Sequence, residues 1–95
     1  MQYEWDERKS RTNKTKHGLL FDVVESFDWA TAIVEVDDRE DYGELREIAF
    51  GFIGAVLYCL IFTWLDDDTV RVISLRPANK REAKRYAQKS RQELG

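Results

Sequence analysis

The chain has 95 residues, of which 43% are hydrophobic and 13% aromatic, enough for one domain over residues 1–95 with a packed core. One proline and five glycines exclude a collagen-like or low-complexity chain, and the aromatic content argues against intrinsic disorder. The net charge of −3 conceals +2 over residues 1–18, −11 over 19–70 and +6 over 71–95, which excludes a general affinity for polyanions but allows a local one.

The N-terminal segment predicts a short strand and a helix. Tyr3–Trp5 alternates as an edge strand does, and Asp6 follows it as a helix N-cap. Gly18 is well placed to end the helix, because glycine readily takes the left-handed conformation found there. The helix holds no large apolar residue. Its spacing places four polar residues on one side, namely Lys9, Asn13, Lys16 and His17.

The next residues predict a second helix and the first main strand. Leu20, Phe21, Val24 and Phe27 recur at helical spacing, so an amphipathic helix is expected over residues 20–27. A strand is expected over residues 30–36, followed by an acidic, turn-rich loop.

Residues 48–65 carry no charge, and 18 positions is the lower limit for a transmembrane helix. Gly51 and Gly54 interrupt this segment, its flanks are acidic, and aromatic and β-branched residues dominate it. We therefore predict no membrane span but two strands joined by a turn at Gly54. Residues 55–65 are apolar on both faces, as expected of a central strand.

The C-terminal part predicts a turn, a strand and a helix. Asp66–Asp68 forms the turn, residues 70–76 form the last strand, and Pro77 ends it. Asn79 then caps a helix, with Glu82 at the N3 position of a capping box. The expected fold class is α+β, with two N-terminal helices, a four-stranded antiparallel meander and a C-terminal helix.

Several kinds of site are excluded by what the sequence lacks. The single cysteine, Cys59, has no partner for an internal disulfide, which fits a reducing compartment. The one histidine, His17, does not build a histidine-rich metal site, and no CxxC or HExxH spacing occurs. No glycine-rich phosphate loop is present, and the first residues are charged, unlike a secretory signal. These features predict a cytoplasmic protein without a metal or cofactor.

Cations near the C-terminus are candidates for binding phosphate. Arg71 and Arg76 lie on the last strand, and Lys80 and Arg81 lie on the helix that follows. Guanidinium groups bind phosphate through two parallel hydrogen bonds and keep their charge at any working pH. Arg71 and Arg76 have opposite parity in a flat strand, so both reach one site only if a bulge or the strand end redirects one of them.

Each candidate also has a purely structural interpretation. Arg71 would equally form an internal salt bridge to Glu44 or Glu47 on a neighbouring strand. His17 has the one side chain suited to proton transfer near neutral pH, but a histidine at a helix end also caps the last carbonyls. Tyr86 fits the core, with its hydroxyl at the edge of a site.

One ordered set of residues extends along nearly the whole chain, from Tyr3 to about Tyr86. Its members are YEWD (Tyr3–Asp6), Lys9, Asn13, KHG (Lys16–Gly18), Phe21, Phe27, DRxxYGExR (Asp38–Arg46), Gly51, RVISLRPA (Arg71–Ala78), Glu82 and Tyr86. This set resembles the BrnT family, the toxins of BrnT–BrnA type II toxin–antitoxin modules, and KHG, GExR and RxISxRxA together make the resemblance specific. The chain departs from the family at Asp66–Asp68, where many relatives have a basic or polar hairpin.

The resemblance implies a RelE-like fold and a ribonuclease that cuts RNA and inhibits translation. It also implies a BrnA-type antitoxin, a ribbon-helix-helix DNA-binding protein that neutralises the toxin. The complex would repress its own operon, so the chain would meet operator DNA only through the antitoxin. The polar signature of the family falls on Lys16, His17, Glu44, Arg46, Arg71, Arg76 and Tyr86.

These residues give a hypothesis for a metal-independent endoribonuclease. Such cleavage needs a base for the ribose 2′-hydroxyl, cations around the transition state and an acid for the leaving oxygen. His17 or Glu44 would be the base, Arg71 and Arg76 would clamp the transition state, and Tyr86 is grouped with them as catalytic. The expected RNA-binding cations are Lys9, Lys16, Arg46, Lys80 and Arg81.

Two other function classes fit the same residues. A non-catalytic nucleic-acid-binding domain would use the same basic ends, which we expect to meet across the sheet as one cationic face. A protein-interaction module would use an exposed sheet edge or the acidic face. Growth arrest on expression, relieved by a neighbouring ribbon-helix-helix protein, separates the toxin from both.

Overall fold

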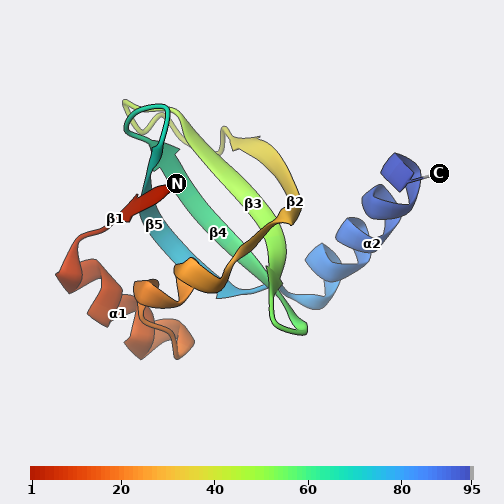
Figure 1. Cartoon of the computed structure of the whole chain (residues 1–95), viewed down its shortest axis with the longest axis horizontal. Coiled ribbons are helices and arrows are strands. Elements are labelled where there is room, and N and C mark those ends of the chain that lie inside the picture. The colour runs from red at the N-terminus through yellow and green to blue at the C-terminus, as the bar shows by residue number, and fades with distance from the viewer. Residues whose placement is uncertain (95) are drawn as a thin grey trace.

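The strands form a single sheet, with α1 and η1 on one side of it and α2 leaving from one end (Figure 1). The computed structural model describes residues 1–94, and side chains for residues 1–92. The elements are β1 (Gln2–Glu4), α1 (Glu7–His17), the 3₁₀ helix η1 (Phe21–Ser26), β2 (Asp28–Asp37), β3 (Arg46–Ile53), β4 (Val56–Trp64), β5 (Thr69–Pro77) and α2 (Lys80–Leu94).

The strand order is β1-β5-β4-β3-β2. Strands β2 to β5 pair antiparallel in sequence order, which confirms the predicted meander. The predicted count of four strands is wrong, because β1 adds a fifth strand, parallel to β5, with Tyr3 opposite Val70. A strand of three residues obtains its backbone partners from the far end of the chain, and the local sequence pattern does not reveal them.

Both predicted caps of α1 are present. The Asp6 carboxylate accepts a hydrogen bond of 2.8 Å from the backbone N–H of Arg8, a bond that also holds the pKa of this carboxyl below its usual range. Gly18 ends the helix at φ 80°, and its N–H donates to the Lys14 carbonyl. A side chain at φ 80° is strained, so glycine suits this position.

Two polar side chains dock α1 onto the sheet, although this helix has no large apolar residue. The Ser10 hydroxyl accepts a hydrogen bond of 2.8 Å from the backbone N–H of Phe21. The Asn13 amide group donates to the carbonyls of Leu75 (2.7 Å) and Leu19 (3.0 Å) and accepts from the Leu75 N–H (3.3 Å). Asn13 thus occupies part of the free edge of β5 and fixes α1 beside it.

The segment predicted as an amphipathic α-helix over residues 20–27 is instead a 3₁₀ helix of six residues. Phe21 and Val24 of this helix and its C-cap Phe27 are three positions apart, which matches the 3.0 residues per turn of a 3₁₀ helix. All three side chains are therefore buried against the sheet. The α-helix prediction is wrong because the same short pattern fits both periods.

The sheet buries one large and one small apolar cluster, on opposite faces. The η1 side chains pack on the larger cluster, formed with Ala49, Leu60, Phe62, Val70, Val72 and Leu75. The smaller cluster consists of Phe50, Cys59 and Ile61 and is flanked by the first turns of α2. Burial raises the pKa of the Cys59 thiol to about 11, so this cysteine is a core residue and not a reactive thiolate.

The uncharged segment over residues 48–65 contributes most of β3 and β4, as predicted, with its turn at Gly54. Among residues 1–94, no helix combines the length and the apolar character needed to span a bilayer.

We expect Gly51→Ala to lower the free energy of unfolding by about 2 kcal/mol, because an added methyl group overpacks the core. A Cβ at this position would lie 2.6 Å from the Cζ atom of Phe27, whose buried ring covers the strand there. Urea unfolding measures the change. In the Phe27→Leu background, Gly51→Ala should lower the free energy of unfolding by less than it does in the wild type. Simple additivity of the two changes would contradict the steric explanation.

Helix α2 begins with the predicted capping box. The Asn79 side chain accepts from the backbone N–H of Glu82 (2.8 Å), and Glu82 accepts from the backbone N–H of Asn79 (2.9 Å). Tyr86 anchors the helix by packing edge-on against Phe52, with ring centres 5.7 Å apart. Beyond Lys89, which still bonds to Glu35 of β2, the last turn of α2 extends away from the sheet (Figure 1).

Candidate nucleic-acid interface

A pocket of about 260 Å³ lies between α1 and β5, and we name it the α1–β5 pocket. Lys9, Lys16 and His17 line it from α1, and Ile73 and Ser74 line it from β5. The helical spacing of the three α1 residues brings them to one side, as the sequence predicted. The remaining lining residues are Thr12, Asn13 and Phe21.

The electrostatic character of the α1–β5 pocket is positive. Among the described side chains, no carboxylate lines it. Both lysines and the histidine are exposed, so a solvent-borne anion reaches them without displacing buried groups. Cationic side chains around an open hollow attract phosphate groups. The arrangement therefore suits a phosphodiester, with an imidazole beside it.

A bulge in β5 places Arg71 and Arg76 on the same face of the sheet, although they would lie on opposite faces of a flat strand. The pairing with β4 shifts between Ile61 and Phe62, which leaves Ile73 as an extra residue on β5. Arg71 then lies opposite Thr63, and Arg76 lies opposite Cys59. The two arginines thus share the sheet face opposite the larger core. The bulge that this arrangement requires is therefore present, but no residue pattern in the sequence predicts it.

Each of these arginines is already matched to a carboxylate. Arg71 pairs with Glu4 of β1, its neighbour in the parallel register, so the predicted alternative of a salt bridge to Glu44 or Glu47 is wrong. That alternative sought partners within the antiparallel meander alone, because the sequence predicts the short N-terminal strand but not its pairing with β5.

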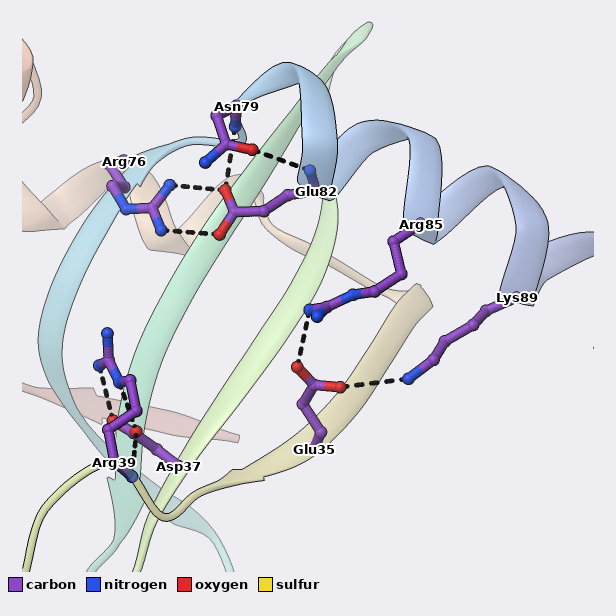
Figure 2. Close-up of polar contacts among 8 residues, drawn as sticks. All are labelled: Glu35, Asp37, Arg39, Arg76, Asn79, Glu82, Arg85 and Lys89. Carbon is purple, nitrogen blue, oxygen red and sulfur yellow. Dashed lines mark hydrogen bonds and ion pairs between the residues drawn. The ribbon is translucent and has the colours of Figure 1, made fainter.

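Arg76 forms a two-pronged ion pair with Glu82, with bonds of 2.7 and 2.8 Å, as Figure 2 shows. Its guanidinium lowers the pKa of the Glu82 carboxyl below the ordinary value of 4.5, and the carboxylate raises the pKa of Arg76. Because Glu82 also belongs to the capping box, this pair joins the end of β5 to the start of α2. The positive charge of Arg76 is therefore largely neutralised by Glu82.

Two further ion-pair groups surround the same face of the sheet (Figure 2). Glu35 of β2 accepts from Arg85 (2.9 Å) and Lys89 (3.2 Å), which tethers α2 to the edge strand. Asp37 is buried and accepts two bonds from Arg39, which holds the pKa of the Asp37 carboxyl below its usual range. With Arg76 and Glu82, these groups frame a hollow of about 280 Å³ whose floor is apolar. Both cations and carboxylates line this hollow, so it has no excess of positive charge comparable to that of the α1–β5 pocket.

The Arg76–Glu82 pair predicts a dependence of stability on acid pH. A lowered pKa in the folded state contributes stability above the unfolded value of 4.5, and this contribution is lost as the pH falls through the folded pKa. Glu82→Gln keeps the capping geometry but removes the charge, so its free energy of unfolding should fall less steeply below pH 4.5 than that of the wild type. Urea unfolding between pH 3 and 7 (roughly the span of carboxyl titration) measures this. The same slope in both proteins would contradict the assignment, and the exposed Glu25→Gln is the control.

The other predicted site residues lie outside the α1–β5 pocket. Glu44 and Arg46 pair with each other at 3.1 Å beside the β2–β3 loop, and Arg46 lies 3.9 Å above the ring of Tyr42. The Tyr86 hydroxyl donates to the Thr31 carbonyl at 2.5 Å.

Lys80 and Arg81 are exposed on the first turn of α2. In Figure 1, α1 and α2 lie at opposite sides of the molecule, so the cations of α2 do not join those of α1 in one face as expected, whereas β5, which carries Arg71 and Arg76, lies beside α1. The reason is the direction of α2, which leads away from the sheet and does not fold back over it.

Sequence reasoning missed some residues of the pocket and of the opposite face. Thr12 lies three residues after Lys9 and four before Lys16, so helical periodicity alone identifies it. Ser74 reaches the pocket beside the β5 bulge, which no local pattern predicts. The pairing of Arg85 with Glu35 joins residues far apart in the chain, and its signal is likewise absent.

Comparisons with known proteins identify the family. The family model described as ribonuclease toxin, BrnT, of type II toxin–antitoxin system matches residues 5–82. Among solved structures, the crystal structure of the Brucella abortus ribonuclease toxin BrnT has 32% sequence identity and a TM-score of 0.64, over 84% of this chain and 99% of that chain. A search among curated proteins finds no match. The sequence motifs, the family model and this structure agree: the chain belongs to the BrnT family of ribonuclease toxins of type II toxin–antitoxin systems.

Proposed function

We propose that the chain cleaves RNA at the α1–β5 pocket, with His17 as the group that moves the proton. The observation that carries this proposal is the lining of the pocket, where the single histidine of the chain stands beside two lysines and no described carboxylate. The family supports the reaction class. Glu44, the other candidate base, is paired with Arg46 elsewhere, so we assign the base to His17.

The proposed step is a transesterification, in which the 2′-hydroxyl of a nucleotide attacks the phosphorus of its own 3′-phosphate. His17 takes the proton of the ribose 2′-hydroxyl, and the 2′-oxygen forms a bond to phosphorus. The bond from phosphorus to the 5′-oxygen of the next nucleotide breaks, and that oxygen takes a proton from solvent. The products are a 2′,3′-cyclic phosphate and a 5′-hydroxyl. Lys9 and Lys16 stabilise the negative charge that develops on the phosphoryl oxygens, so we propose that no metal ion is required.

Arg71 and Arg76 keep a supporting role in this proposal. Each stands on β5 near the pocket residue Ser74, but each is bound to a carboxylate. Their predicted clamp on the transition state, which would cost about 10²–10³ in rate if lost, stays a prediction. It is tested with Arg71→Ala and Arg76→Ala, each checked for folding.

We expect Lys16→Gln to reduce both RNA binding and cleavage by about tenfold or more at low salt, because one phosphate contact is lost. The slope of the logarithm of the binding constant against the logarithm of salt concentration should fall by about 0.7, the contribution of one phosphate on a single strand. Lys14→Gln is the matched control, since Lys14 lies on the same helix but does not line the pocket.

Cleavage of an unstructured RNA, with and without EDTA, is the direct test. Salt-dependent binding without any product would favour the non-catalytic nucleic-acid-binding domain instead. An equal effect of Lys14→Gln and Lys16→Gln would remove the α1–β5 pocket from the proposal, and loss of cleavage in EDTA would remove metal independence.

We further propose that cleavage inhibits translation in the cytoplasm and that a BrnA-type ribbon-helix-helix antitoxin neutralises the chain. The complex would then bind operator DNA through the antitoxin. Membership of a toxin–antitoxin family supports the partnership. Growth arrest on expression of the wild type, relieved by co-expression of the antitoxin, tests it. The RelE-like classification of the fold stays a prediction.

A further inference from the structure

One end of the sheet carries a cluster of exposed apolar side chains. Most of the exposed large hydrophobic residues of the described chain lie there, on β2, β4 and the loops that follow them, and they are between 42% and 64% exposed. This cluster, which we name the β-end patch, consists of Val34, Val36, Leu45, Trp64 and Leu65. Its residues belong to the second half of β2, the loop before β3, the end of β4 and the turn that follows it.

The β-end patch has two parts, Val34 and Val36 on the edge strand β2 and Leu45, Trp64 and Leu65 around the end of β4, and Glu47 of β3 lies between them. Val36 lies opposite Glu47, and Glu47 lies opposite Phe62, so these side chains share the face of the larger core. The ring of Phe62 packs edge-on against that of Trp64, with centres 6.0 Å apart. Leu45 adjoins Trp64 because both line one hollow of about 250 Å³. Helices α1 and η1 cover this face only at its other end, which leaves the patch exposed.

Acidic side chains border the β-end patch and, at Glu47, lie between its two parts. Glu44 and Glu47 line the hollow with Leu45, and Asp66 and Asp67 line an adjoining one of about 370 Å³ with Trp64 and Leu65. Among the described residues, neither hollow is lined by a lysine, an arginine or a histidine. Glu44 pairs with Arg46, whereas Glu47, Asp66 and Asp67 have no ion pair within residues 1–92.

An exposed apolar cluster of this kind marks an interaction surface, and its charge decides the partner. RNA is repelled by the bordering carboxylates, so the patch is no extension of the α1–β5 pocket. A protein segment with apolar side chains flanked by lysine or arginine satisfies both the patch and its border. We propose that the β-end patch is the anchoring site for the antitoxin, through a basic segment with apolar anchors. This inference rests on the proposed toxin–antitoxin partnership.

The key experiment compares two exposed valines. Val36→Lys places a cation in the part of the patch on the edge strand β2, whereas Val56→Lys places one at the opposite end of the sheet, at a residue of similar exposure. The probe is the antitoxin purified from its complex with the wild-type chain. We expect Val36→Lys to weaken binding by about 100-fold, as for an interface hot spot, and Val56→Lys to leave it unchanged. Full affinity in Val36→Lys, or equal losses in both variants, would overturn the inference.

A second variant tests the acidic border without touching the apolar cluster. Asp66→Asn/Asp67→Asn keeps the size and hydrogen-bonding capacity of the β4–β5 turn. It should slow association with the antitoxin by about tenfold at low salt and flatten its dependence on ionic strength, because steering by charge is lost. Association that is unaltered by this change would contradict the choice of a basic segment.

Tryptophan fluorescence reports occupation directly, because Trp64 is one of three tryptophans and lies in the patch. Antitoxin should protect wild-type fluorescence from acrylamide, and Trp64→Phe should lose this protection. If the wild-type chain alone associates at micromolar concentration and Val36→Lys does not, the occupant is a second copy and the inference is wrong.

Failure of this inference is distinguishable from failure of the proposed function. Val36→Lys should cleave RNA at the wild-type rate, because the α1–β5 pocket is remote from it. If cleavage and antitoxin binding both persist in Val36→Lys, only the docking site is wrong. If no toxin–antitoxin complex forms at all, the partnership is wrong and the docking site falls with it, whatever the result for RNA cleavage.

Discussion

Asn13→Ala is expected to lower the free energy of unfolding by about 3 kcal/mol, more than any other single change considered for this fold. Asn13 is 6% exposed, and two of its three hydrogen bonds join the Leu75 backbone at the free edge of β5, while the third joins the Leu19 carbonyl. Alanine leaves the Leu75 N–H and C=O buried without partners, and each such group costs about 1–3 kcal/mol. Urea unfolding followed by far-ultraviolet circular dichroism measures the loss.

Two further variants test the physical explanation of this prediction. Thr15→Ala removes a hydroxyl from the exposed side of the same helix and should change stability by no more than about 0.5 kcal/mol. Asn13→Asp keeps an acceptor for the Leu75 N–H but places an oxygen against the Leu75 carbonyl, so it should destabilise at least as much as alanine. A loss below about 1 kcal/mol in Asn13→Ala would show that water replaces the amide and that α1 is not held by it.

The effect of Asn13 also reaches the α1–β5 pocket. Lys16 and His17 lie in the last turn of α1, and Asn13 is the side chain that fixes this turn against β5. We therefore expect Asn13→Ala to impair RNA cleavage even where the protein remains folded. Asn13 thus both stabilises the fold and positions the proposed site, although its helix has no apolar face.

Local chemistry was predictable from the sequence, and long-range partnership was not. Asp6, Gly18 and the Asn79–Glu82 capping box were predictable because each acts within four residues of itself. The side of α1 that carries Lys9, Lys16 and His17 follows from helical periodicity in the same way. These signals need no knowledge of the tertiary structure.

What could not be predicted depends on contacts between distant segments. The salt-bridge alternative for Arg71 placed its partner within the meander, but β1 brings Glu4 beside it from the start of the chain. The bulge at Ile73 changes the face of every following β5 residue, and only the β4–β5 register reveals it. The three charge segments can be read from the sequence, but the direction of α2, which keeps its cations away from α1, cannot.

Replacing His17 with alanine should lower the rate constant for RNA cleavage by about 10²–10⁴, the usual contribution of a positioned acid or base. RNA binding should change little, because Lys9 and Lys16 remain, so the loss is expected in kcat and not in KM. His17 is exposed at the end of α1, and unfolding should confirm that stability is nearly unchanged. A loss of less than about threefold, well below that contribution, would exclude a role in proton transfer.

Added imidazole separates a chemical role of His17 from a structural one. The α1–β5 pocket of about 260 Å³ is open to solvent, so imidazole can enter the space left in His17→Ala and restore part of the rate. A helix-capping histidine would show no such rescue, because its contribution lies in the last turn and not in the pocket. Glu44→Gln is the parallel test of the other candidate base and should keep its activity, because Glu44 is bound to Arg46 away from the pocket. Rescue absent in His17→Ala together with activity lost in Glu44→Gln would transfer the base to Glu44 and move the reaction to the β2–β3 loop.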